Sequence, residues 1–440
     1  MSNFSIRPHI FVLFCAVTIP LCPKIRIDDN VFIYWQEIVM AIYSIFFYIF
    51  KLKWLFNNKY IKTFFLFLCF ILFSNLLNGF VYGFDFSGMA RILKLFIYLP
   101  LFYTSTLISR KHILCKVVIG ISIFAMAMNV LMLVSNILKG YDIVDLIWKQ
   151  ELMVSGLSNR YFDLKKMKLN VTGSGAHGIW LNYCTMMIIL AYTCLKKRII
   201  SKSIFIFLLS LYSTNLLMSS SREGLLVLFV YLIFSYFHAL RKIFIVEKKF
   251  VYISLILALF IGLVIKFSDN LGIIKKIVYT YEKISAGKME GNIQTRINSW
   301  KISSLSFMSE PCNSIFGYGW NKKAYVSALS SAKNKYSFSE KYIALPESLI
   351  MMGLVYGGIF GLMLILLHFY HLFRFCFYNY NNFAIRNYLF FLIGIFIVNI
   401  ISGASYIADL FLAQNIIVQG LILKESIFSN GQKMYPVSQC

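Results

Sequence analysis

Residues 62–82 read KTFFLFLCFILFSNLLNGFVY, with a single charged residue at the start. A bilayer core about 30 Å thick is crossed by a helix of about 20 mostly apolar residues, so this stretch predicts a membrane span. Similar runs recur along the chain and predict twelve spans in all. They cover residues 9–23, 31–50, 62–82, 92–108, 113–138, 176–195, 200–219, 223–239, 250–267, 347–373, 387–403 and 405–423.

The composition agrees with a membrane protein. Hydrophobic residues make up 59% of the 440 residues and charged residues 14%, whereas soluble domains average about 45–50% and about 25%. The mean hydropathy is +0.72. These values exclude a disordered chain and favour an all-α integral membrane protein. The nine cysteines form no CxxC pair or Cys/His cluster, so we expect neither a disulfide framework nor a metal site.

The positive charges are distributed unevenly along the chain, whose net charge is +25. Such an excess would indicate nucleic acid in a soluble protein, but membrane proteins gather Lys and Arg in cytoplasmic loops. With the N-terminus in the cytoplasm, twenty Lys and Arg fall in cytoplasmic connections and five in short outer loops, namely Lys24, Arg26, Arg91, Lys94 and Arg222. We therefore expect both termini in the cytoplasm and no nucleic-acid partner.

Two long outer loops are expected to divide the chain. The expected parts are spans one to five (1–138), a loop (139–175), spans six to nine (176–267), a larger loop (268–346), and spans ten to twelve with a tail (347–440). Loops this long are usually functional or disordered. In the larger loop, apolar residues at helical spacing from Leu271 to Tyr281 predict an amphipathic helix at the membrane surface. A second helix is expected from near Arg296 through Trp300 to Leu305.

Arg222 is the sharpest candidate for a functional residue. It follows three serines in the short turn predicted between spans seven and eight, Ser219-Ser-Ser-Arg-Glu-Gly224. An arginine at membrane depth is costly and is a functional candidate by default, and its planar guanidinium suits phosphate. The helix that begins at Glu223 would add backbone donors to an anion site. The alternative is an interfacial arginine that pairs with Glu223.

Other outer residues are candidates for binding the same anion or its substrate. Arg160 and Arg296 lie in the two long loops, and Arg91 lies in a short one. Guanidinium groups bind phosphate through paired hydrogen bonds, although each of these arginines could equally be a solvated loop charge. His177 is the one histidine on the predicted outer side. A structural role is the open alternative for His177.

The end of the larger loop holds two further signals. Glu347, in Ala344-Leu-Pro-Glu-Ser-Leu-Ile350, begins the tenth predicted span. A carboxylate there is favoured by the helix dipole, so Glu347 is either a helix-terminal charge or a general base at the membrane face. In Phe316-Gly-Tyr-Gly-Trp320, the glycines allow a tight turn or a close backbone approach to a ligand.

Three features together resemble the O-antigen polymerase and O-antigen ligase superfamily of bacterial envelopes. They are about twelve spans, the run Ser219–Leu226, and a large outer loop before the third-last span. The family-like residues of that loop and the following span are Arg296, Trp300, Gly317-Tyr-Gly-Trp320, Leu345-Pro-Glu-Ser-Leu349, Gly353, Gly357 and Gly358.

The resemblance implies a GT-C-like glycosyltransferase of the bacterial inner membrane that uses undecaprenyl-pyrophosphate-linked glycans without a metal or other cofactor. Arg222 and Arg296 would neutralise the leaving pyrophosphate, and Glu347 would accept the proton of the acceptor hydroxyl. The residues expected to bind substrate are Arg91, Arg160, His177, Trp300, Tyr318 and Trp320. A chain-length regulator and a flippase of the same pathway are candidate partners.

Three functions are compatible with this resemblance or with the span count. Ligases typically carry a histidine after the large loop, whereas Glu347 stands at the matching place and residues 268–346 contain no histidine. This difference favours an O-antigen polymerase over an O-antigen ligase. A lipid-linked oligosaccharide flippase should carry charges within its spans and have short outer loops. The predicted spans are nearly free of charge and one outer loop is long, which favours an enzyme.

Overall fold

The structure is a computed structural model in which helices predominate. It describes residues 7–28, 31–108, 110–137, 160–163, 168–171, 176–218, 221–242, 281–282, 285–286, 291–309, 311–336, 348–401 and 405–423. Within these ranges, seven helical segments are long and apolar enough to cross a membrane, and three shorter apolar helices accompany them. The prediction of a helical membrane protein is thus confirmed in outline.

Each predicted span except 250–267 overlaps a described helix, and the span 92–108 is divided between two helices, α4 and α5. That span and residues 271–280 of the predicted amphipathic helix lie outside the described residues. The helices are α1 (Arg7–Val17), α2 (Trp35–Phe56), α3 (Lys59–Tyr82), α4 (Phe86–Tyr98), α5 (Pro100–Leu107), α6 (Lys111–Ile137), α8 (Ala176–Lys196), α9 (Lys202–Met218), α10 (Arg222–Lys242), α13 (Gly291–Ser309), α14 (Pro311–Phe316), α15 (Lys322–Tyr336), α16 (Leu349–Tyr378), α17 (Phe383–Ile401) and α18 (Asp409–Leu423).

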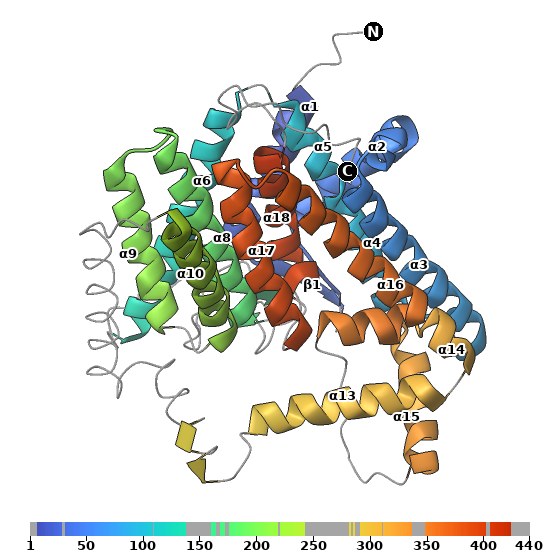
Figure 1. Ribbon diagram of the computed structural model, residues 1–440. Helices are drawn as coiled ribbons and strands as arrows, with labels where there is room; N and C mark the ends of the chain where they lie inside the picture. Colours follow the sequence, from blue (N-terminus) through green and yellow to red (C-terminus); the bar gives the residue numbers. More distant parts are fainter. Residues whose placement is uncertain are drawn as a thin grey trace.

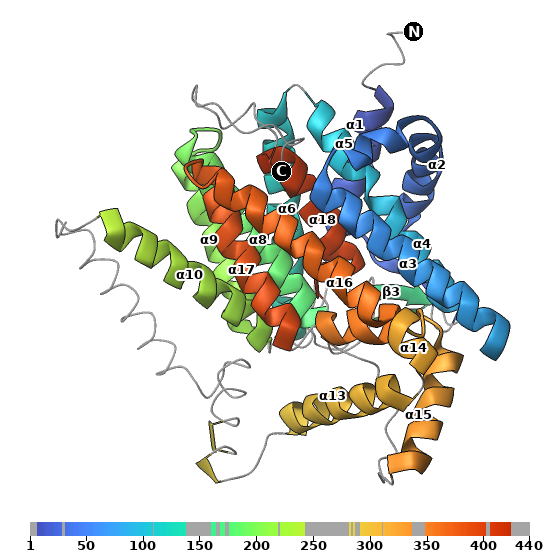
Figure 2. The same ribbon diagram turned by 45° about the vertical axis from the view of Figure 1, so that its right-hand side comes forward.

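Helix α18 lies in the middle of the bundle (Figures 1 and 2). Residues 410–422 are all buried, and α18 packs mainly against α5 and α8. Its polar side chains have protein partners: Gln414 Nε2 donates to the carbonyl of Ala16 at 2.7 Å, and Tyr388 donates its hydroxyl to Asn415 Oδ1 at 2.8 Å. An unpaired polar group in an apolar interior is costly, so these hydrogen bonds fix the rotation of α18.

A small sheet, which the sequence did not predict, joins two of the outer loops. Its strands are β1 (Lys24–Asp28), β2 (Val31–Ile33), β3 (Arg160–Asp163) and β4 (Lys168–Val171), in the order β2-β1-β3-β4. Strands β1 and β3 pair in parallel, and Arg26 Nη1 donates to Asp163 Oδ2 at 3.0 Å. These two loops therefore lie on the same side of the molecule, as the predicted alternation of spans requires.

Helix α16 is broken at Gly358, where φ is +60°. A break leaves carbonyls in the preceding turn without their helical donors. The loop after α14 supplies donors instead: the N–H of Tyr318 bonds to the Val355 carbonyl and the N–H of Gly319 to the Tyr356 carbonyl, both at 2.8 Å. The segment 316–320 therefore stabilises the break in α16 by hydrogen bonds and connects α14 and α15 to the bundle.

The backbone of the two glycines in the segment 316–320 closely approaches the neighbouring helices. Gly317 and Gly319 have φ of +75° and +60°, and a Cβ at Gly319 would overlap the backbone of Asn75 in α3. Asn78 Nδ2 donates to the Gly317 carbonyl at 3.0 Å. The role of these glycines in the structure is thus to let the loop dock on α3 and α16, and their predicted approach to a ligand is not what the described contacts show.

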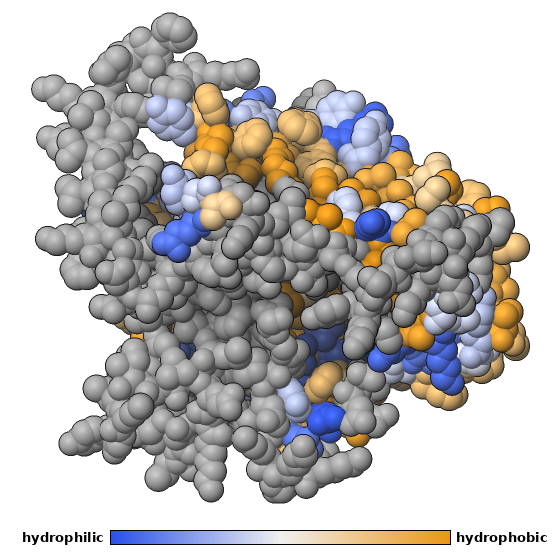
Figure 3. All heavy atoms as spheres, turned by 90° about the horizontal axis from the view of Figure 1, so that it is seen from below, coloured by the Kyte–Doolittle hydropathy of each residue, from blue (hydrophilic) through white to orange (hydrophobic). Residues whose placement is uncertain are grey.

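Helices α13 and α15 lie below the helical bundle (Figures 1 and 2). Helix α13 packs against α14, α15 and α16. Seen from below, the described residues of this face include both hydrophilic and hydrophobic ones (Figure 3). The described helices of the predicted loop 268–346, which are α13, α14 and α15, therefore lie at one end of the bundle.

Candidate functional site

Arg222 is the first residue of α10 and is half-buried. Helix α10 packs against α8 and α17. The residues on either side of Arg222 lie against Gly178 in the first turn of α8: the Glu223 carboxylate occupies the place of a Cβ at Gly178, and Ser221 Oγ lies 3.5 Å from that place. Because His177 directly precedes Gly178, the structure brings two predicted site residues, Arg222 and His177, to one corner of the bundle.

Helix α13 confirms the helix predicted around Arg296, and it begins five residues earlier, at Gly291. Trp300 is half-buried. In Figure 2 the end of α10 that holds Arg222 lies beside the lower ends of α8 and α17, on the side of the bundle that faces α13. Arg222 and Arg296 therefore lie on separate elements at the same end of the molecule. The side chains of Arg296, Arg160 and His177 lie outside the described part of the structure.

Tyr318 occupies a packing position. Its side chain is fully buried, its hydroxyl donates to the Ser306 carbonyl at 2.8 Å, and its ring meets Tyr325 edge to face at 6.1 Å. The ring has no exposed face for a sugar in this structure. Trp320 is half-buried, with its ring 5.4 Å from that of Tyr356, so it is the better placed of the two for a ligand contact.

The Asp85 carboxylate caps two helices at once. Its Oδ1 accepts from the backbone N–H groups of Ser87 and Gly88 in α4, at 3.0 and 3.2 Å. Its Oδ2 accepts from the N–H of Lys322, the first residue of α15, at 2.9 Å. Burial raises the pKa of the Asp85 carboxyl, but these hydrogen bonds outweigh it and hold the pKa below the usual range. Exposed Arg91 follows on α4.

A shallow depression lies at this junction, and Asp85, Ser87, Lys322, Lys323, Val326 and Ser327 line it. None of the lining residues belongs to the predicted site. The junction is therefore the place where α15 is attached to α4, and we assign it a structural role.

We expect Asp85→Ala to loosen α15 from α4, because the loss of a cap costs about 0.5–2 kcal/mol. Limited proteolysis within 322–336 should become faster, and Asp85→Asn, which keeps an acceptor oxygen, should behave more like the wild type. Since the folded pKa is depressed, the stabilisation is present at neutral pH and is lost only as the pH falls below the ordinary aspartate pKa of about 3.9. Unchanged proteolysis in Asp85→Ala, relative to the exposed control Ser330→Ala, would contradict the double cap.

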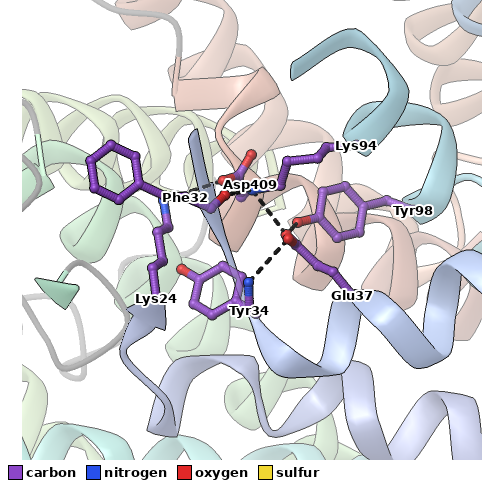
Figure 4. Close-up of polar contacts among 7 residues, drawn as sticks. All are labelled: Lys24, Phe32, Tyr34, Glu37, Lys94, Tyr98 and Asp409. Atoms are coloured by element: carbon purple, nitrogen blue, oxygen red, sulfur yellow. Dashed lines mark hydrogen bonds and ion pairs between the residues drawn. The ribbon is translucent and has the colours of Figure 1, made fainter. Parts of the chain in front are cut away.

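A buried charge cluster lies where α2, α4 and α18 meet (Figure 4). Lys94 Nζ donates to Asp409 Oδ2 at 2.9 Å and to the Phe32 carbonyl at 2.7 Å, and it lies 3.2 Å from Glu37 Oε1. The side chains of Lys94 and Glu37 are 11% and 3% exposed. The interpretation that the spans are nearly free of charge was wrong at these three ionisable residues.

The remaining members of the charge cluster complete its hydrogen bonding. Lys24 of β1 lies 3.2 Å from Asp409 Oδ2. Tyr98 donates its hydroxyl to Glu37 Oε1, and the N–H of Tyr34 donates to Glu37 Oε2 at 3.1 Å. Two lysines and two carboxylates balance, and the described contacts satisfy them mutually. The cluster therefore has the character of a brace between helices, and it does not line a transport path in the described contacts.

The sequence contains a signal for this cluster. Single ionisable residues inside apolar runs are functional or paired by default, and Glu37, Lys94 and Asp409 all stand in such runs. Lys24 and Lys94 were counted instead as outer-loop charges. One of the two arguments against a flippase is therefore lost, and the argument that remains is the predicted length of the loop 268–346.

Glu347 lies outside the described residues, but its neighbour bears on its role. Helix α16 begins at Leu349, and its N-cap is Ser348, whose Oγ accepts from the N–H of Met351 at 3.1 Å. The cap of this helix is thus provided by Ser348. A capping function for Glu347 is not needed at this helix start.

Comparison with protein families was informative for this region. Residues 204–366 match the family model described as O-antigen ligase. Over these residues, the match supports the predicted resemblance to the O-antigen polymerase and ligase superfamily. The matched segment runs from α9 to α16 and contains Arg222, Arg296, Trp300, Trp320 and Glu347.

A search of the curated proteins found no match to this chain. The family assignment rests on the matched segment, which leaves Arg91, Arg160 and His177 outside it. For these three residues, the structure alone supplies an argument: His177 adjoins the Arg222 corner, Arg91 lies near the α4–α15 junction, and Arg160 begins β3.

Proposed function

We propose that the protein is an O-antigen polymerase that joins undecaprenyl-pyrophosphate-linked repeat units at the periplasmic face of the inner membrane. The observation that carries the proposal is the placement of Arg222 at the first turn of α10, at the end of the bundle where α13 brings Arg296, within a segment of O-antigen ligase type. An anionic leaving group at this end would meet cationic side chains from two elements.

The proposed reaction is an inverting glycosyl transfer that needs no metal. A hydroxyl of the acceptor sugar attacks the anomeric carbon of the donor, the new glycosidic bond forms, and the bond to the lipid pyrophosphate breaks. Arg222 and Arg296 stabilise the negative charge that develops on the pyrophosphate. Electrostatic stabilisation by fixed groups is usually the largest single contribution to catalysis. Glu347 accepts the hydroxyl proton.

Transfer of finished polymer to lipid A-core by an O-antigen ligase is the second candidate, and the description of the matched family favours it. The glutamate at position 347, where ligases typically carry histidine, favours the polymerase. Lipopolysaccharide profiling of a deletion strain separates the two. A lipid A-core that carries a single repeat unit indicates loss of a polymerase, whereas a core without any repeat unit indicates loss of a ligase or flippase.

The proposed topology places the outer layer in the periplasm and residues 51–62 in the cytoplasm. In a background in which the exposed native Cys312 is replaced by serine, we expect a membrane-impermeant thiol reagent to label cysteines introduced at exposed positions of α15, such as Ser330→Cys, in intact cells. Cysteines introduced at exposed Lys53 or Lys59 should react only after the membrane is opened. The reverse labelling pattern would overturn the topology and the location of the site.

Glu347→Gln tests the proposed base. A general base contributes roughly 10²–10⁴-fold to a rate, whereas the loss of a helix-terminal charge costs only about 0.3–1 kcal/mol. We therefore expect normal expression and almost no polymer from purified lipid-linked repeat units. Ser348→Ala is the matched control, because it removes the observed cap and leaves the carboxylate. Near-normal polymer from Glu347→Gln would show that the base is another residue.

A further inference from the structure

The corner that holds Arg222 is built from an unusually close contact between α8 and α10. A Cβ at Gly178 of α8 would overlap the Glu223 carboxylate, and a Cβ at Gly224 of α10 would overlap the side chain of Leu181. Each helix thus has a glycine where the other places a side chain. Small residues at such crossings allow helix backbones to approach closely.

The two residues on either side of Arg222 both contact Gly178 of α8. Ser221 is buried, with its Oγ 3.5 Å from the place of a Cβ at Gly178. Glu223 lies on the same glycine. Both neighbours of Arg222 are therefore held by the first turn of α8, so the backbone of Arg222 takes its position from α8 as well as from its own helix.

We propose that Glu223 and Gly178 are positioning residues for Arg222, and that their contact sets where the guanidinium stands relative to the leaving group. This inference rests on the proposed function. A misplacement of about 1 Å in a catalytic group can cost about 10²-fold in rate, so a change in this contact should affect turnover without removing any group that touches substrate. The contact also holds His177, one residue before Gly178, at the same corner.

A double-variant cycle tests the contact. Gly178→Ala, Glu223→Ala and the two together are purified and assayed for kcat and KM with lipid-linked repeat units. We expect Gly178→Ala to lower kcat about as far as Glu223→Ala does, and by at most about 10²-fold, because its methyl group overlaps the carboxylate at the end of the Glu223 side chain and forces that carboxylate out of its place against α8. In the Glu223→Ala background there is room for the methyl group, so adding Gly178→Ala should change kcat less than twofold. Glu223→Gln, which keeps the shape and an acceptor oxygen, should retain most of the turnover lost in Glu223→Ala.

The matched control is Gly394→Ala in α17, where a Cβ would meet Val227 of the same helix α10 at 3.0–3.3 Å. It crowds α10 but lies away from Arg222, so kcat should stay near wild type while the thermal midpoint falls. If Gly178→Ala lowers kcat no more than Gly394→Ala does, or if the two changes are additive in the cycle, the positioning role is overturned. Arg222→Ala separates this failure from that of the proposed function: wild-type turnover in Arg222→Ala would remove the site itself.

Should Gly178→Ala fail to fold, Glu223→Ala still decides the question, because it introduces no overlap. A loss of kcat in Glu223→Ala with restoration in Glu223→Gln supports positioning. Equal kcat in Glu223→Ala and the wild type contradicts it.

Discussion

Arg222→Ala is expected to abolish polymer formation while the protein still accumulates in the membrane. A single fixed hydrogen-bond donor to a developing negative charge contributes about 10²–10³-fold to kcat. Arg222 is half-buried at the start of α10, and other residues of α10 make the packing contacts with α8 and α17. Its removal should therefore affect the reaction far more than folding. The measurement is the lipopolysaccharide ladder of a complemented deletion strain, with membrane levels measured on the same cells.

Two further variants sharpen this prediction. Arg222→Lys should recover little polymer, because a point charge does not reproduce the paired hydrogen bonds of a guanidinium. Arg374→Ala, which removes a half-buried arginine near the C-terminal end of α16, should leave the ladder unchanged. A ladder of wild-type length with Arg222→Ala would exclude this residue from the mechanism.

Lys94→Met should cause the largest loss of stability among the single substitutions considered. It leaves the buried Glu37 carboxylate and Asp409 without their shared cation, and breaking a buried ion pair from one side costs about 3–5 kcal/mol. The thermal midpoint in detergent should fall well below that of Lys53→Met, which removes an exposed lysine of α2 and should cost no more than about 0.5 kcal/mol.

The charge balance of the cluster gives a second test of the same prediction. Lys94→Met combined with Glu37→Gln removes one charge of each sign and leaves the contact between Lys24 and Asp409. The double variant should lose less free energy of unfolding than the two single variants lose together, because the residues share one network. Strict additivity, or a midpoint for Lys94→Met equal to that of Lys53→Met, would mean that the cluster does not brace the bundle.

The sequence predicted the features that depend on runs of similar residues and missed those that depend on distant pairings. Apolar length located helices at eleven of the twelve predicted spans, seven of the described helical segments being long enough to cross a membrane, and the helix expected near Arg296 is α13. The break in α16 was missed because Gly358 stands within an apolar run, and only the donors from Tyr318 and Gly319 make that break stable. The sheet was missed because its strands are short and β1 pairs with a strand more than 130 residues later.

The candidate site shows the same division. Arg222 was predicted from its residue type and its place at a turn. The role of Gly178 was not, because it arises from the contact between α8 and α10. The short turn predicted between spans seven and eight would suggest that α9 and α10 pack on each other, whereas α10 packs chiefly on α8 and α17. Pairwise packing of this kind leaves no periodic trace in a single sequence.

The central position of α18 constrains how the protein is made. Lys94 leaves the ribosome 315 residues before its partner Asp409, a delay of roughly 15–60 s at about 5–20 residues per second. During this time Glu37 is the carboxylate of the cluster already available to Lys24 and Lys94, and the space that α18 fills remains open. The bundle can close only when this late helix enters between helices inserted long before it. The nascent protein must therefore hold an unfinished, charged interior within the membrane until α18 has been synthesised.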